Sequence, residues 1–297
     1  MDVLVAGASG FVGSRLCPAL QEAGHRVRAM TRHPDTYQGA GQPVRADVRD
    51  ARSLAAAAEG CDAAYYLVHS LDMAGFEKED AEAARTFGSV AARAGLKRIV
   101  YLGGLGSDED DLSPHLRSRH HVETLLGDAG VPVTTLRAGI IIGHGGISWE
   151  ITRQLVENLP AMITPRWVRT KTQPIAIADV VRYLVAVLDL PDAAGQTFEI
   201  GGPEALEYTQ MMHRLAALEG RRRLVIPVPF LSPSLSSWWL ALVTNVDIRT
   251  GRSLVDSMIN EVVVRDDSVR ELVPFEPMDY DNAVLQALGE RAKATRS

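Results

Sequence analysis

The chain has 297 residues, of which 46% are hydrophobic and 23% charged, and its formal net charge is −6 at pH 7. These values are typical of a globular protein of one α/β unit or two small domains, and an acidic balance without a basic stripe argues against a nucleic-acid partner. Cys17 and Cys61 are expected to be buried free thiols in a reducing, cytoplasmic compartment. The chain opens directly into a predicted core strand, which argues against a signal peptide.

The first thirteen residues predict a strand, a glycine-rich turn and the start of a helix. Residues 3–6 are apolar, as in a strand buried on both faces, and residues 11–23 have helical spacing. The first glycine allows a tight turn, the second lets a pyrophosphate approach the backbone, and the third lets the helix pack on the strand. The helix N-terminus offers free N–H groups and a positive dipole to an anion. We therefore predict dinucleotide binding along Gly7, Ala8, Ser9, Gly10, Phe11, Val12 and Gly13.

The end of a second predicted strand, residues 26–30, is where a dinucleotide site selects its cofactor. An acidic residue there would accept hydrogen bonds from the ribose 2′-hydroxyl of NAD, but this chain has Thr31 and Arg32. A guanidinium pairs with a 2′-phosphate through two parallel hydrogen bonds. We therefore expect NADP(H) to be preferred over NAD(H), the alternative being that Arg32 is a solvated surface residue.

Two more predicted strands, residues 43–46 and 63–68, bring further residues to the same edge of the sheet. Asp47 and Val48 follow the first strand, and Asp47 is expected to accept a hydrogen bond from the adenine amine. Val68 and His69 lie at the end of the second, near the pyrophosphate or the nicotinamide ribose. A loop histidine with a structural hydrogen bond is the alternative for His69.

Strands and helices continue to alternate up to about residue 140. Helices are predicted over residues 51–58, 77–94 and 113–128, and strands over residues 98–102 and 132–137. Six strands alternating with helices predict a Rossmann-type doubly wound α/β fold with a parallel sheet. Four residues after the last two strands complete the expected cofactor edge: Gly103, Ala138, Gly139 and Ile140. The acidic loop at residues 108–111 is expected to be solvated, and no metal site is predicted.

The second half alternates less regularly, and no long linker divides the chain. Helices are predicted over residues 149–158, 179–188, 208–218, 250–260 and 279–294, and strands over residues 174–177, 196–200 and 225–228. We expect a single NAD(P)-binding unit over residues 1–297. Its Rossmann core would comprise residues 1–140 with returning strands near 174–200, and a smaller substrate lobe would comprise residues 140–172 and 203–297.

Residues 224–246 contain no charged side chain, over about the length of a membrane span. Pro227, Pro229 and Pro233 argue against a continuous spanning helix. We interpret the segment as core and as the wall of a hydrophobic substrate pocket formed with residues 140–149, Trp167 and residues 230–239. A subunit interface and a shallow, peripheral membrane contact are the alternatives, and the protein is expected to be a monomer or a homodimer.

The order of these motifs resembles the short-chain dehydrogenase/reductase superfamily, in its extended and atypical branches. Residues 136–143 look like the sixth strand and the turn beside the nicotinamide, and residues 173–180 look like a strand followed by Asp179, which caps a helix. With the opening motif and residues 196–202, the resemblance covers about residues 3–203. Residues 64–70 and 159–162 are most similar to the atypical NAD(P)H-binding group, which includes nitrogen-regulator-like proteins and an accessory subunit of respiratory complex I.

The resemblance implies catalytic residues that this chain lacks. Active members carry a serine or threonine after strand five, then a tyrosine and, four residues later, a lysine. Gly103 and Gly104 stand where the hydroxyl residue is expected, and the aligned tyrosine and lysine positions hold His115 and Arg119. No tyrosine occurs between residues 101 and 183 and no lysine between residues 97 and 171, so conventional catalysis from this helix is excluded.

Three interpretations of His115 and Arg119 stay open. In the first, His115 is a substitute proton donor and Arg119 holds the nicotinamide ribose, which predicts an NADP(H)-dependent oxidoreductase acting on a hydrophobic small molecule. In the second, the site binds NADP(H) without turnover, as in a redox sensor, a regulator or an assembly subunit. In the third, both side chains are solvated. A sugar-nucleotide epimerase or dehydratase is the least favoured function, because it depends on the missing tyrosine.

Overall fold

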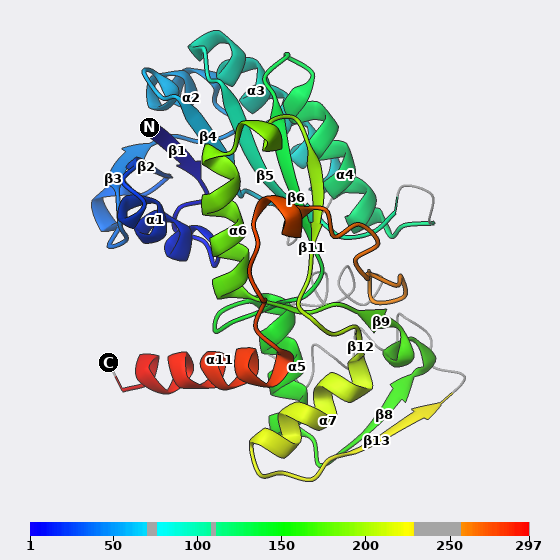
Figure 1. Cartoon of the computed structure of the whole chain (residues 1–297). Helices are drawn as coiled ribbons and strands as arrows, with labels where there is room; N and C mark the ends of the chain where they lie inside the picture. The colour runs from blue at the N-terminus through cyan, green and yellow to red at the C-terminus, as the bar shows by residue number, and fades with distance from the viewer. Residues whose placement is uncertain (70–75, 108–110, 229–256, 297) are drawn as a thin grey trace.

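A seven-stranded parallel sheet forms the centre of the computed structural model, which describes residues 1–69, 76–107, 111–228 and 257–296 (Figure 1). Its strands are β1 (Asp2–Ala6), β2 (Arg26–Thr31), β3 (Gln42–Arg45), β4 (Ala63–Tyr66), β5 (Arg98–Gly104), β6 (Val133–Ala138) and β11 (Thr197–Ile200). Their order is β11-β6-β5-β4-β1-β2-β3, so the direction of winding reverses at β1. Ligands of such sheets bind at this switch point, outside the carboxyl ends of the strands. The predicted Rossmann-type α/β fold is confirmed.

The sheet separates two apolar cores, because alternate residues of a strand point to opposite faces. Val3 and Val5 pack in the core under α1 and α6, whereas Leu4 and Ala6 pack in the core under α2, α3 and α4, and all four are fully buried. Figure 1 shows the two helical layers on either side of the sheet. The helices are α1 (Gly13–Glu22), α2 (Ala51–Ala58), α3 (Phe76–Ala94), α4 (Pro114–Gly127) and α6 (Ile177–Asp189).

A smaller region lies at the carboxyl end of the sheet, in the lower part of Figure 1. Its helices share a third apolar core that contains Trp149, Met211 and Val284. These helices are α5 (Ile147–Asn158), α7 (Tyr208–Leu218) and α11 (Tyr280–Ala294). Three strand pairs accompany them: β7 (Ile141–Ile142) with β10 (Ile175–Ala176), β9 (Lys171–Thr172) with β12 (Leu206–Glu207), and β8 (Ala161–Pro165) with β13 (Leu224–Val228). Short helical turns elsewhere are η1 (Pro34–Thr36), η2 (Arg166–Arg169), η3 (Pro191–Ala193) and α10 (Val269–Leu272). The division into a Rossmann core and a substrate lobe stays a prediction.

Some sequence predictions differ from the structure. Strand β5 continues through Gly103 and Gly104, because both glycines pair with β6 despite their low intrinsic strand preference. The capping role implied for Asp179 is wrong: the residue lies inside α6, and its carboxylate accepts a hydrogen bond of 2.7 Å from the Met278 N–H instead. Most of the uncharged segment, the pocket residues 230–239 and most of the helix predicted over residues 250–260 lie outside the described residues.

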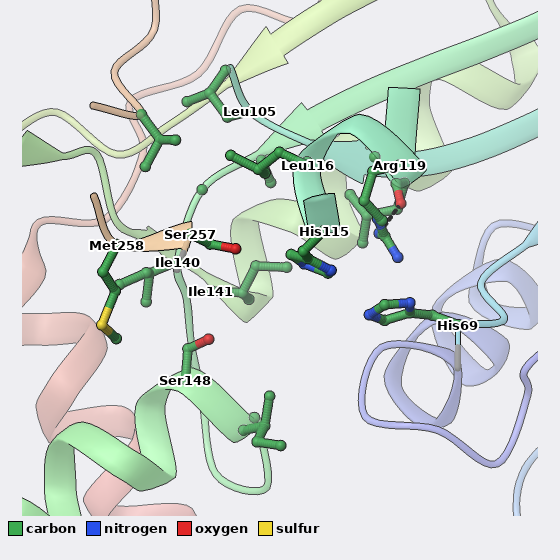
Figure 2. A pocket seen from close by; sticks show the side chains of 18 of the residues that line it. His69, Leu105, His115, Leu116, Arg119, Ile140, Ile141, Ser148, Ser257 and Met258 are labelled. Carbon is green, nitrogen blue, oxygen red and sulfur yellow. Dashed lines mark hydrogen bonds between the residues drawn. The ribbon is translucent and has the colours of Figure 1, made fainter. Parts of the chain in front are cut away.

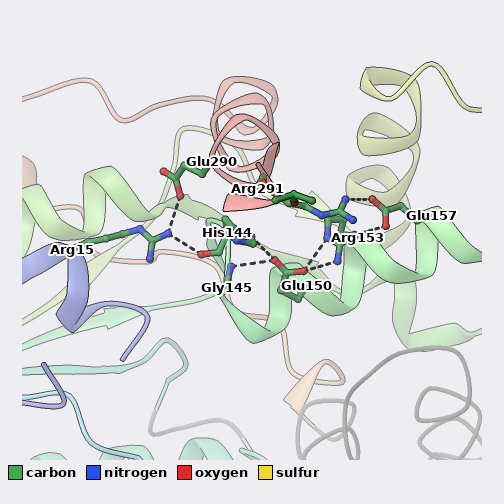
Figure 3. Close-up of polar contacts among 9 residues, drawn as sticks. Arg15, His144, Gly145, Glu150, Arg153, Glu157, Glu290 and Arg291 are labelled. Carbon is green, nitrogen blue, oxygen red and sulfur yellow. Dashed lines mark hydrogen bonds and ion pairs between the residues drawn. The ribbon is translucent and has the colours of Figure 1, made fainter. Parts of the chain in front are cut away.

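A chain of ion pairs joins the helix after the glycine turn to the smaller region (Figure 3). Arg15 on α1 donates to the His144 carbonyl at 2.8 Å and pairs with Glu290 on α11 at 2.8 Å. Glu150 on α5 accepts from the Gly145 N–H at 3.1 Å and lies 3.2 Å from the His144 ring. The chain continues on α5 and α11 through Arg153, Glu157 and Arg291. These contacts fix the position of α1, and with it the glycine turn, relative to the smaller region.

Cys17 and Cys61 are free and buried, as predicted, and burial raises the pKa of the Cys17 thiol to about 11. Within the described ranges, no helix has the length and apolar character needed to cross a membrane. The same part of the chain shows no cluster of three or more side chains suited to hold a metal ion.

Candidate functional site

The glycine turn between β1 and α1 has the close packing that its sequence predicts. Gly7 has a φ of +90°, and a Cβ there would lie 2.9 Å from the Leu67 carbonyl oxygen. A Cβ on Gly13 would lie only 2.1 Å from the Gly7 carbonyl oxygen, so the helix starts directly against the turn. The Gly10 N–H closes the turn on the Gly7 carbonyl at 3.0 Å. Bare backbone therefore faces the space in front of the turn, as a pyrophosphate requires.

An outer cleft of about 400 Å³ extends from this turn toward the ends of β2 and β3. Most of the residues predicted to bind the dinucleotide line it, namely Gly7, Ser9, Gly10, Thr31, Arg32, Asp47, Val48, Val68 and His69. Three predicted residues line neither this cleft nor the inner pocket described below: Ala8 is fully buried in a core, and Val12 and Gly13 form the start of α1 behind the turn.

Arginines stand at the far end of the outer cleft. Arg32 is exposed there, and Arg49, which sequence reasoning missed, lines the same cleft. The Arg49 guanidinium donates to the Asp47 carboxylate at 3.3 Å, and this hydrogen bond lowers the pKa of Asp47 below its usual value. Arg49 also lies 3.7 Å from Glu79. Asp47, predicted to accept from the adenine amine, is therefore already hydrogen-bonded to a cation. The sequence signal that could have identified Arg49 as a residue of this cleft is its position two residues after Asp47.

Thr31 has an internal role in this cleft. Its buried hydroxyl accepts a hydrogen bond of 3.1 Å from the His33 N–H and so fixes the loop after β2. This loop also carries Arg32.

An inner pocket of about 230 Å³ begins where the outer cleft ends, and His69 lines both (Figure 2). Predicted residues that line the inner pocket are Phe11, His69, Gly103, His115, Arg119, Ala138, Gly139 and Ile140. Ser148 lies in the predicted pocket wall at residues 140–149, whereas sequence reasoning missed Tyr208, Ser257 and Met258, which come from distant parts of the chain. Burial raises the pKa of the Tyr208 phenol, so it stays protonated. Trp149 packs in the third core instead of the pocket, and the Trp167 side chain lies outside the described structure.

His115 is the second residue of α4 and points into the inner pocket. Its ring lies 5.1 Å from that of His69, measured between centroids, with a tilt of 36°. The buried Nδ1 atom has no hydrogen-bond partner in the described part of the chain. Burial, with smaller contributions from the charges of His69 and Arg119, lowers the pKa of His115 well below 6.5. The solvated interpretation of His115 is therefore wrong, and the premise that this ring titrates near neutrality does not hold.

Arg119 lies one helical turn after His115, against strand β5. Its guanidinium donates to the Leu102 carbonyl and lies over the Tyr101 ring, 5.5 Å from the centroid. It lines the inner pocket, where its planar fork of donors can meet a ribose or an acceptor oxygen. Gly104 is packed beneath the same helix, since a Cβ there would lie 2.9 Å from the Leu116 Cδ2 atom. Close packing of α4 on β5 thus explains a glycine where a hydroxyl residue was expected.

The chain is similar to a described protein family, to several sequence relatives and to a solved structure. A family model described as NAD(P)H-binding matches residues 7–191. An uncharacterised sugar epimerase of Bacillus subtilis is 30% identical over 153 residues, covering 47% of this chain and 72% of the relative. Sanguinarine reductase of Eschscholzia californica is 26% identical over 257 residues, covering 69% and 91%. The chain spans 25% of the length of an uncharacterised Mycobacterium tuberculosis protein that is 28% identical over 234 residues, 78% of this chain.

A solved structure extends the likeness to almost the whole chain. The NADPH-dependent quinone oxidoreductase of Escherichia coli, complexed with NADPH, superposes with a TM-score of 0.78 at 20% identity, covering 96% of this chain and 99% of that one. At this identity the likeness establishes the fold.

Proposed function

Because this chain belongs to the NAD(P)H-binding family, we propose that it is an NADP(H)-dependent oxidoreductase that reduces a hydrophobic small molecule. The observation that carries the proposal is the continuity of the outer cleft with the inner pocket through His69. A dinucleotide laid along the cleft from the arginines past the glycine turn would bring its nicotinamide to the inner pocket. Apolar residues predominate in that pocket, which suits a hydrophobic acceptor and excludes water.

A bound reduced nicotinamide would supply a hydride in the inner pocket. The glycine turn would hold the pyrophosphate on bare backbone, and Arg119 would hold the nicotinamide ribose or an acceptor oxygen. His115, kept neutral by burial, can donate a hydrogen bond to the acceptor. The names of the two relatives, a sanguinarine reductase and a quinone oxidoreductase, support a reductase.

The preference for NADP(H) rests on the cations of the outer cleft. Arg32 is exposed beside the cleft, and Arg49 adds a second guanidinium, although the carboxylates of Asp47 and Glu79 offset part of the positive charge. Charge-assisted hydrogen bonds of this kind contribute about 1.5–3 kcal/mol, so NADPH should bind at least about tenfold more tightly than NADH. Titration calorimetry of the native chain and of Arg32→Ala tests this preference. Equal affinities for the two cofactors in the native chain would contradict it.

The alternative is an NADP(H)-binding sensor, regulator or assembly subunit without turnover. The glycines at the end of β5 and the neutral His115 favour it, because neither supplies the usual catalytic groups. Assaying hydride transfer from NADPH to a panel of quinones, enones and aldehydes separates the two functions. The name of the Bacillus subtilis relative suggests a sugar-nucleotide epimerase. That function fits the apolar pocket poorly, and this chain lacks the helix tyrosine on which it depends. The cytoplasmic location and the oligomeric state stay predictions.

A further inference from the structure

A buried carboxylate stands behind His69. Asp80, on α3, is 4% exposed, and its Oδ2 atom lies 3.5 Å from the His69 Nδ1 atom. Taking a carboxylate out of water is unfavourable unless a positive or hydrogen-bonding partner meets it. With Nδ1 turned toward Asp80, Nε2 is the ring nitrogen on the side of His69 that faces the inner pocket. Figure 2 shows the His69 ring directed toward His115 across that pocket.

The two histidines compete for one proton. Their rings are 5.1 Å apart in a partly dehydrated pocket, where two adjacent imidazolium ions would repel each other. Asp80 favours the proton on His69, because its carboxylate lies beside that ring and stabilises the charged form. His115 instead occupies a helix N-terminus and has the Arg119 guanidinium nearby, and both disfavour a positive charge on it. Among the residues that the structure describes, the charged and titratable groups that face the His69 ring or share its two hollows are Arg32, Asp47, Arg49, Glu79, Asp80, His115, Arg119 and Tyr208.

We propose that His69, held by the carboxylate of Asp80, supplies the proton to the reduced substrate, while His115 stays neutral beside it. The proposal rests on the proposed oxidoreductase function. When a carbonyl or quinone acceptor gains a hydride from the reduced nicotinamide dinucleotide, it is left as an oxyanion. The oxyanion takes the Nε2 proton of the His69 imidazolium, so that one O–H bond forms and one N–H bond breaks. His69 then regains a proton from solvent, and Asp80 acts as a positioning residue.

Two classes of acceptor separate a proton donor from a residue that only shapes the pocket. Menadione, a quinone, takes a hydride and a proton, whereas crystal violet, a triphenylmethane cation, takes a hydride and no proton. His69→Asn should slow menadione reduction about 100-fold more than it slows crystal violet reduction, because a loss of that size is typical of a missing general acid and any shared loss reports the shape of the pocket. His213→Asn, at an exposed position on α7, is the matched control and should change neither rate. Equal losses with both acceptors in His69→Asn would overturn the role of His69.

Histidine titration by 15N NMR gives a readout that needs neither cofactor nor turnover. Asp80→Asn replaces the carboxylate by a neutral group of the same shape, so the pH midpoint at which His69 gains its proton should fall by about one unit. The menadione rate should be highest below that midpoint, decline above it, and decline at correspondingly lower pH in the variant. Glu82→Gln removes an exposed carboxylate from the same helix and should leave the midpoint unchanged. An unchanged midpoint in Asp80→Asn overturns the proposal.

The outcomes distinguish this proposal from the function on which it rests. If the native chain transfers hydride to neither acceptor, the oxidoreductase function fails and the proton donor fails with it. If hydride transfer occurs but His69→Asn loses both activities equally, only the role of His69 is overturned.

Discussion

Gly13→Ala tests whether the glycine turn has the packing described above. The new Cβ would lie 2.1 Å from the Gly7 carbonyl oxygen and 2.8 Å from the Ala8 Cα atom. Both neighbours are backbone atoms, so α1 must move away from the turn by about 1 Å to restore an ordinary contact. Overpacking of this kind costs typically 1–3 kcal/mol, and a clash with backbone on two sides places this variant near about 3 kcal/mol.

Urea denaturation of three variants measures the effect. Gly289→Ala is the matched control, since its Cβ would meet nothing within 4 Å on helix α11 and should stabilise the chain by about 0.5–1 kcal/mol. Gly10→Ala should cost less stability than Gly13→Ala, because its Cβ would lie 3.2 Å from the Gly7 carbonyl oxygen and needs a smaller adjustment. It should lower NADPH affinity at least tenfold, because the new methyl group lies where the pyrophosphate approaches. If Gly13→Ala unfolds at the same urea concentration as Gly289→Ala and binds NADPH like the native chain, the reasoning is wrong.

Three further changes have expected outcomes. Arg15→Ala should lower the free energy of unfolding by about 1 kcal/mol, because it removes a partly exposed ion pair with Glu290 and a hydrogen bond to a carbonyl, and urea denaturation measures it. Burial alone would raise the pKa of Glu150, but hydrogen bonds from the Gly145 N–H and from Arg153 outweigh burial and hold this pKa below 4.5. The ionised Glu150 therefore stabilises the fold above pH 4.5, and this contribution is lost as the pH falls below that value. Thermal unfolding between pH 3 and 7 detects the loss. Burial raises the pKa of Asp179, so Asp179→Asn should increase stability at pH 7, with a gain that disappears in acid, provided the new amide oxygen still accepts from the Met278 N–H.

The parts of the fold that the sequence predicted depend on local signals. Strand β1 was recognised as buried on both faces because its residues are apolar in succession, and the core positions of Val3 and Leu4 confirm this. Gly7 and Gly13 were assigned correctly because a strand, a turn and a helix follow one another within thirteen residues. Short-range patterns of this kind need no knowledge of what packs on them.

The parts that the sequence did not predict depend on contacts between distant segments. Gly103 and Gly104 belong to β5 because β6 pairs with them, and nothing in their own sequence indicates a strand. Tyr208 and Ser257 reach the inner pocket from residues far along the chain. Asp80 lies only eleven residues after His69, but the two side chains meet because of how α3 packs on the sheet, which the local sequence does not indicate.

The changes that separate this site from the usual short-chain dehydrogenase pattern are connected through one packing contact. The Leu116 side chain occupies the space that a Cβ at residue 104 would need. Leu116 directly follows His115 in α4. Because α4 packs this closely on β5, the Arg119 guanidinium donates to the Leu102 carbonyl. The lysine at this position in the usual pattern instead lowers the pKa of the catalytic tyrosine. No hydroxyl side chain can return to residue 104 unless Leu116 moves. The close packing at residue 104 thus accounts for the missing serine or threonine, and if the proposed reductase function holds, the proton would be supplied from the opposite wall of the pocket, where His69 lies.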